Sequence, residues 1–403
     1  MVYEYSSNEE KLIIALLNRN NVSALDIAEN TTLNTRKLVS MADRHMVFPL
    51  ILDRLFHLPL QNIPADELFP KGRRIIIAAA AVNMKLRSEL SRTTRILGKE
   101  GISFLLIKGF AVDKNPLRKT NDIDILIHRE DLHRTVALLE KAGYNYTGSG
   151  VMSAKEIQNP FGTLDWNNQF QFETPSGGVS LEVHTNLFER DRIRLEKLDK
   201  FLDNVDLFWK ESRFDEELGC SIPSTEATLA LLCVHSSTKR SPAHNTYIAR
   251  HAYDILQTLK CGVDQSRFIS LCTSWGLEYY AYTALYLTSL CLNTDAPLNA
   301  AAPLEDLLSK RCKRLADIHL KCFRGLGHAS FFYRMLFALL MPMAIGGNLR
   351  KILRHYRLIV FPPLWQQENL FGVRRDSAAI YLTYLYGPFV RAFVIMKRWL
   401  SDG

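Results

Sequence analysis

The sequence predicts an α+β chain in which a small mixed sheet lies between N-terminal helices and a larger C-terminal helical domain. Apolar residues recur at helical spacing over 1–95, short β-rich runs occupy 96–192, and helical spacing returns over 193–403. These three ranges are the expected domains. With 403 residues, 47% of them hydrophobic, the chain is long enough for several buried cores.

The N-terminal region is expected to be helical throughout. Its first helix should begin near Ser7-Asn-Glu-Glu10, a capping-box pattern that precedes apolar residues at helical spacing. Further helices are expected over 24–30, 36–58 and 71–98, with breaks at Pro49, Pro59 and Pro64.

The middle region has the alternation and turn residues of a sheet. Apolar runs over 102–107 and 122–127 predict two strands, and a helix over 130–142 should end at Gly143. Two more strands, 168–174 and 179–185, flank the turn Pro175-Ser-Gly-Gly178 and should form an antiparallel hairpin. After about residue 192 no strand is expected, and helices are predicted over 224–238, 247–260, 265–275 and 279–292.

Composition limits the class of protein. The formal charge of +8 favours an anionic partner, although the basic runs 310–314 and 350–357 are interpreted as solvated helix faces. The C-terminal aromatic segments 331–333, 361–365 and 381–386 are interpreted mostly as helical core. The most apolar stretch, 335–345, is shorter than the roughly 18 to 20 residues that span a bilayer. No targeting segment is apparent, and seven scattered cysteines fit a reducing compartment. We therefore expect a cytoplasmic protein without a transmembrane segment.

Two acids share one face of the strand predicted over 122–127. In this strand, alternation directs Asp122 and Asp124 to one side and the three isoleucines to the other. Neighbouring carboxylates repel each other, and a hard divalent cation such as Mg2+ relieves the repulsion by accepting oxygen ligands. The pair is therefore a candidate metal site.

A third acid is expected from the hairpin. Alternation over 179–185 directs Glu182 to the face opposite the apolar residues of that strand. Two-metal phosphoryl transfer requires several carboxylates, because one cation activates the attacking hydroxyl and the other neutralises the leaving group. Glu182 is the favoured third acid, and Glu173 and Asp165 are alternatives for the same role.

A glycine turn precedes the acid pair. The strand over 102–107 leads into Lys108-Gly109, and a glycine lets backbone amides approach phosphate oxygens closely. Lys108 and Arg118 could supply positive charge there, or could instead be ordinary surface cations or partners of Asp113 and Asp122. No Walker motif occurs in the chain.

These segments together resemble a known family. Lys108-Gly109 followed by Arg118-Lys-Thr-Asn-Asp-Ile-Asp-Ile125 is similar to the nucleotidyltransferase pattern of the DNA polymerase beta superfamily, a glycine turn and then (S/N)-D-I-D-hydrophobic. With Leu181-Glu-Val-His-Thr-Asn-Leu187 and Leu231-Leu-Cys-Val-His235, about residues 95–290 resemble a bacterial family of uncharacterised nucleotidyltransferases, and also the abortive-infection-type nucleotidyltransferase toxins. Many superfamily members have Gly-Ser at the turn, where this chain has Gly109-Phe110.

The resemblance implies a nucleotidyltransferase sheet and transfer of an NMP from an NTP, such as ATP, to an acceptor hydroxyl with release of pyrophosphate. It implies that Asp122, Asp124 and Glu182 are catalytic and hold two Mg2+ or Mn2+ ions. The nucleotide-binding residues that it implies are Lys108, Gly109, Arg118 and Asn121. A small molecule or a protein is favoured over RNA as the acceptor.

Other readings of the same residues stay open. Gly109-Phe110 favours a non-catalytic nucleotide-binding regulatory protein, and two more alternatives are a toxin-type enzyme that modifies tRNA or protein and a nuclease or phosphotransferase that uses the same acids. Several polar residues from segments expected near the sheet are interpreted as buried pairs that tie helices together: His184, His235, Arg250, His251 and Asp254.

Overall fold

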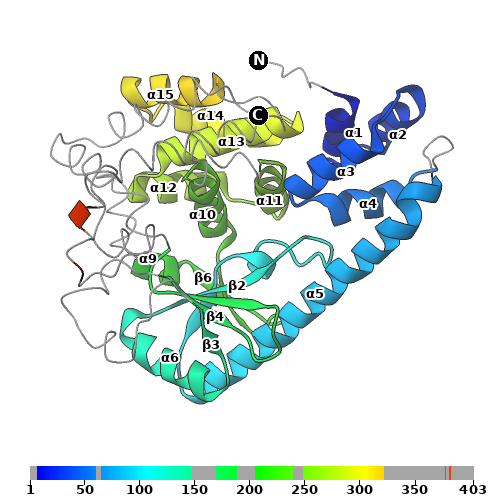
Figure 1. The fold of residues 1–403 in the computed structure, drawn as a ribbon. Helices are drawn as coiled ribbons and strands as arrows, with labels where there is room; N and C mark the ends of the chain where they lie inside the picture. The colour runs from blue at the N-terminus through cyan, green and yellow to red at the C-terminus, as the bar shows by residue number, and fades with distance from the viewer. Residues whose placement is uncertain are drawn as a thin grey trace.

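The computed structural model describes residues 7–59, 65–147, 169–187, 205–238 and 248–321, together with residues 377, 381 and 382. Within these residues, helices surround a mixed sheet, which confirms the α+β class (Figure 1). None of the described helices is both long and apolar enough to cross a membrane. The expectations for 331–333, 335–345, 350–357 and 361–365 lie outside the described residues, and of the aromatic segment 381–386 only Tyr381 and Leu382 are described, both exposed rather than in a core.

The N-terminal region is helical, as predicted. Its first four helices are α1 (Asn8–Leu17), α2 (Asn21–Asn30), α3 (Thr35–Arg44) and α4 (Phe48–Phe56). Ser7 caps α1 by accepting a hydrogen bond from the Glu10 amide at 3.3 Å. The break expected at Pro49 within 36–58 lies a few residues earlier, between α3 and α4, where Met46 adopts a left-handed backbone with φ of 56°. Pro49 then lies in the first turn of α4, where a missing amide hydrogen costs little.

A long helix, α5 (Ala65–Lys99), leads from this region to the sheet and runs along it (Figure 1). In the described residues the sheet has seven strands in the order β3-β4-β5-β2-β1-β7-β6. Their bounds are β1 (Phe104–Leu106), β2 (Asp122–Ile127), β3 (Asn145–Tyr146), β4 (Gln169–Glu173), β5 (Ser180–His184), β6 (Ser212–Asp215) and β7 (Cys220–Pro223). The acid strand β2 is central, between an antiparallel β1 and a parallel β5.

The predicted hairpin is present, since β4 and β5 pair antiparallel around the glycines of the turn. The expectation that no strand follows residue 192 is wrong, because β7 pairs parallel with β1 and β6 pairs with β7 at the sheet edge. Each of these two strands has four residues, which is too short for alternation to be recognised, and their place depends on the distant β1.

The remaining described elements are mostly helical. Two short 3-10 turns, η1 (Gly109–Ala111) and η2 (Arg129–Asp131), flank β2 in the chain, and α6 (Leu132–Lys141) follows them. The C-terminal helices are α9 (Val205–Lys210), α10 (Thr225–Thr238), α11 (Ile248–Lys260), α12 (Gln265–Trp275), α13 (Glu278–Leu292), α14 (Ala296–Glu305) and α15 (Lys310–Lys321). In α15, Lys310, Arg311 and Arg314 are exposed while Cys312 and Leu315 are buried, as expected for a solvated helix face.

The two faces of β2 belong to different hydrophobic cores. Ile123, Ile125 and Ile127 pack with apolar residues of α5 and α6. On the opposite face, Leu126 belongs to a core built largely by helices α10, α12 and α13. Since Asp122 and Asp124 share the face of Leu126, the acids are directed to the side of the sheet where the C-terminal helices lie (Figure 1).

Candidate functional site

Parallel pairing between β2 and β5 brings the predicted acids side by side. The register joins Asp122 to Ser180, Asp124 to Glu182, and Leu126 to His184. Residues directly opposite each other in neighbouring strands point to the same face, so Glu182 lies beside Asp124. A shift of one residue would have turned Glu182 to the apolar side, so the register decides the composition of the site.

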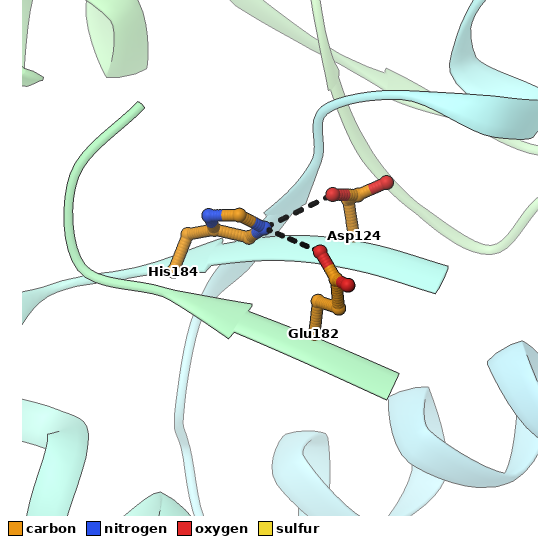
Figure 2. A group of neighbouring side chains, drawn as sticks. All are labelled: Asp124, Glu182 and His184. Carbon is orange, nitrogen blue, oxygen red and sulfur yellow. Dashed lines mark hydrogen bonds and ion pairs between the residues drawn. The ribbon is translucent and has the colours of Figure 1, made fainter. Parts of the chain in front are cut away.

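Asp124, Glu182 and His184 form a compact group of side chains (Figure 2). One potential ligand atom from each residue lies within 4.8 Å of those of the other two. Nε2 of His184 is 3.0 Å from Oδ1 of Asp124 and 3.6 Å from Oε2 of Glu182. Two carboxylates and an imidazole at this spacing match the donor set of a divalent cation. Strand alternation directs His184 to this face, but alternation alone does not separate a metal ligand from a buried polar partner.

Asp122 stands at the beginning of β2, next to this group. Burial raises the pKa of its carboxyl to about 6, and the nearby carboxylates of Asp124 and Glu182 contribute to the rise. Lys108 and Arg250 act in the opposite direction. Without a bound cation, the site therefore disfavours a charged Asp122.

Lys108 neutralises part of the acidic charge. Its Nζ donates a hydrogen bond to Oδ1 of Asp124 at 2.5 Å. Burial raises the pKa of the Asp124 carboxyl, but Lys108 and His184 outweigh burial and hold that pKa well below its ordinary value. Asp124 is thus ionised, with the ammonium group of Lys108 in contact.

The glycine turn approaches the acid strand closely. Gly109 has a φ of 61°, and a Cβ at this position would lie 3.3 Å from Cγ2 of Thr120. Any other residue would be strained by the backbone and crowded by its neighbour. Phe110 is buried in the core shared with α5, and the guanidinium of Arg87 lies 5.0 Å from the centre of its ring. The side chain that replaces the usual serine is thus a core residue, and the turn presents its backbone and Lys108.

Arg118 is engaged in a buried ion pair. Its Nε and Nη2 each donate to a different oxygen of Asp254 in α11 at 2.7 Å, and Nη1 donates to Oγ1 of Thr120 at 2.8 Å. The sequence suggests Asp113 or Asp122 as alternative partners, but the ion pair is with Asp254, 136 residues away in the chain. Asn121 is exposed directly before Asp122.

The loop between Gly109 and Asp122 is fixed from two sides. From α5, Nδ2 of Asn83 donates to the carbonyl oxygens of Pro116 at 2.6 Å and of Arg118 at 3.2 Å. From α11, the hydroxyl of Tyr253 donates to Oδ2 of Asp113 at 3.1 Å. The loop that joins the glycine turn to the acids is therefore held by helices from both sides.

The alternative third acids do not lie in this group. Glu173 is exposed, and it pairs with Ser180, which in turn pairs with Asp122 rather than Asp124. Asp165 lies outside the described residues. Among the other polar residues expected near the sheet, the rings of His235 and His251 meet edge to face with centroids 5.3 Å apart, as expected for buried polar residues that join α10 to α11.

Comparison with known proteins agrees with the motif. No match was found among curated proteins or solved structures. A family model described as "Uncharacterised nucleotidyltransferase" matches residues 31–293, which include the glycine turn, the acid strand, the hairpin and α11. This match covers most of the chain, and the chain therefore belongs to the uncharacterised nucleotidyltransferase family.

Proposed function

We propose that the protein is a metal-dependent nucleotidyltransferase that moves an NMP from an NTP to an acceptor hydroxyl and releases pyrophosphate. The observation that carries the proposal is the group of Asp124, Glu182 and His184, with Asp122 beside it, behind a fixed glycine turn. Membership of a nucleotidyltransferase family supports the same reaction class.

The donor set fits a divalent cation, because carboxylate oxygens and an imidazole nitrogen converge within 4.8 Å. Asp122, Asp124 and Glu182 would hold two Mg2+ or Mn2+ ions, with His184 as a further ligand or a hydrogen-bond partner that orients Asp124. Bound divalent cations supply Lewis-acid activation of the hydroxyl and neutralise the charge that develops on the leaving pyrophosphate.

The residues of the chain position the reactants. The acceptor oxygen forms a bond to the α-phosphorus while the bond from that phosphorus to the bridging oxygen of pyrophosphate breaks. Glu182 is proposed to receive the proton of the acceptor hydroxyl, since its carboxylate is only partly buried beside Asp124. Lys108, the backbone at Gly109 and Asn121 would contact the NTP, while Arg118 would act indirectly by fixing the loop through Asp254.

A small molecule or a protein is the acceptor that we favour. The exposed basic residues of α15 lie on a helix whose other face is buried, so they do not form a continuous tract for a phosphate backbone.

The described cysteines are all free, which supports the proposed cytoplasmic location.

The test is incubation of the purified protein with labelled NTPs, Mg2+ or Mn2+ and a cell extract. We expect a labelled small molecule or protein, and no labelling with Asp122→Ala combined with Asp124→Ala, while circular dichroism shows that this variant folds. Labelled tRNA would favour the toxin-type alternative. Binding of NTP without any transfer would favour a regulatory protein. Full activity of the double variant would refute the mechanism.

A further inference from the structure

The triphosphate of an NTP brings several negative charges to a site that already contains three carboxylates. Enzymes that transfer phosphoryl groups surround the phosphates with Arg, Lys and metal ions for this reason. Of the two cations predicted for this role, Lys108 also neutralises Asp124, and Arg118 is bound to Asp254 through two hydrogen bonds. A further cation near the acid strand is therefore expected if the site binds a triphosphate.

Arg250, in the first turn of α11, has the position that this role requires. Its Nη1 donates to the backbone oxygen of Lys119 at 3.4 Å, three residues before Asp122. The same Nη1 lies 3.3 Å from Sδ of Met46, and the side chain is half-buried. One turn further along the same helix, Tyr253 and Asp254 hold the loop that begins at the glycine turn.

Lys119 is the neighbouring cation, but its side chain extends away from the acids. Its Nζ lies 3.3 Å from Oδ1 of Asp43 in α3, and the side chains of Lys119 and Asp43 are 39% and 64% exposed. An exposed pair of this kind contributes little to stability, so Lys119 serves as a matched control for the loss of a positive charge from the same loop.

On the proposed nucleotidyltransferase function, we infer that Arg250 of α11 contacts the triphosphate of the bound NTP, so that the helical part supplies a nucleotide-binding residue in addition to Lys108. An arginine suits the role because its planar guanidinium can donate two parallel hydrogen bonds to a phosphate while it stays charged at any physiological pH. The hydrogen bonds of Tyr253 and Asp254 hold α11 to the loop that precedes the acid strand. They thereby keep the guanidinium of Arg250 at a fixed place relative to the proposed metal ligands.

The probe is inorganic tripolyphosphate with Mg2+, since it needs no knowledge of the base, and α,β-methylene-ATP serves as a second, non-transferable probe. We expect Arg250→Ala to weaken binding of both probes by about tenfold or more, as for loss of a hydrogen bond to a charged group. Arg250→Lys should retain part of the affinity. Lys119→Ala should bind both probes within about twofold of wild type, because an exposed pair makes only a small contribution.

A structural role for Arg250 predicts a different result. Mn2+ binding measured by electron paramagnetic resonance, and the thermal unfolding midpoint, should be the same in Arg250→Lys and wild type, while tripolyphosphate binding is reduced. Unchanged tripolyphosphate binding in Arg250→Ala would overturn the inference, as would an equal loss of Mn2+ and tripolyphosphate binding in both Arg250 variants. If these variants bind normally while the wild type still transfers NMP, the inference alone fails. If the wild type neither binds tripolyphosphate nor transfers NMP, the proposed function fails with it.

Discussion

Substitution of Asp122 by asparagine should stabilise the protein in the absence of divalent cations. Burial and the neighbouring carboxylates raise the pKa of Asp122 from its ordinary 3.8 to about 6. Because the pKa is higher in the folded chain than in the unfolded chain, the folded state binds more protons between about pH 4 and pH 6. The stability that protonated Asp122 contributes is therefore lost as the pH rises through this window. Asparagine keeps the shape of the side chain and removes the charge.

The size of the effect follows from the shift. A difference of about 2 pKa units corresponds to about 3 kcal/mol at pH values above both pKa values. We expect Asp122→Asn to exceed wild type by about 2 to 3 kcal/mol in the free energy of unfolding at pH 8, and by less than about 1 kcal/mol at pH 4. The assay is urea unfolding at both pH values in EDTA, followed by circular dichroism.

Glu173→Gln is the matched control, because Glu173 lies on the same face of the sheet but is exposed. Its loss should change stability by no more than about 0.5 kcal/mol at either pH. A variant Asp122→Asn that is no more stable than wild type at pH 8, or whose gain in stability is the same at pH 4 and pH 8, would contradict a raised pKa of Asp122 in the folded protein.

Three further predictions concern the turn, the loop and the cation. Gly109→Ala should cost more stability than Gly177→Ala, measured by urea unfolding, because both have positive φ but only Gly109 meets Cγ2 of Thr120 at 3.3 Å; equal costs would contradict the close approach. Arg118→Ala should destabilise by about 3 to 5 kcal/mol since it leaves Asp254 buried without its partner, and Arg118→Met with Asp254→Leu should recover much of the loss. If the double variant Arg118→Met with Asp254→Leu is no more stable than Arg118→Ala, the loss is not due to the unpaired charge of Asp254. Mn2+ at about 100 times its dissociation constant should raise the free energy of unfolding of wild type by about 2.7 kcal/mol, measured by urea unfolding. It should leave the variant Asp122→Ala with Asp124→Ala unchanged; equal stabilisation of both proteins would show that the cation binds at another site.

Local sequence patterns predicted most of the core around the site. The strand over 122–127 and the helix over 265–275 have the predicted bounds, and the hairpin follows from its Pro-Ser-Gly-Gly turn. These features depend on alternation, helical spacing and turn residues, which are properties of short windows. The proximity of Glu182 to Asp124 also followed from alternation, once the two strands paired in this register.

Features that depend on distant partners were not predictable in the same way. The ion pair of Arg118 with Asp254 joins residues 136 positions apart, and β6 and β7 exist as strands because β1 offers an edge for pairing. The position of His184 against both Asp124 and Glu182 likewise depends on the pairing register. The division at 95/96 and 192/193 into three domains stays a prediction.

The proposed transfer of an NMP is tested most directly by following the phosphorus atoms of the NTP. Two parallel reactions contain purified protein, Mg2+ or Mn2+, and a cell extract as the source of the acceptor. One reaction contains NTP labelled at the α-phosphate, and the other contains NTP labelled at the γ-phosphate. We expect the α-label to be transferred to the acceptor and the γ-label to be released in pyrophosphate. Transfer of the γ-label to the acceptor would show a phosphotransferase and contradict the proposed reaction.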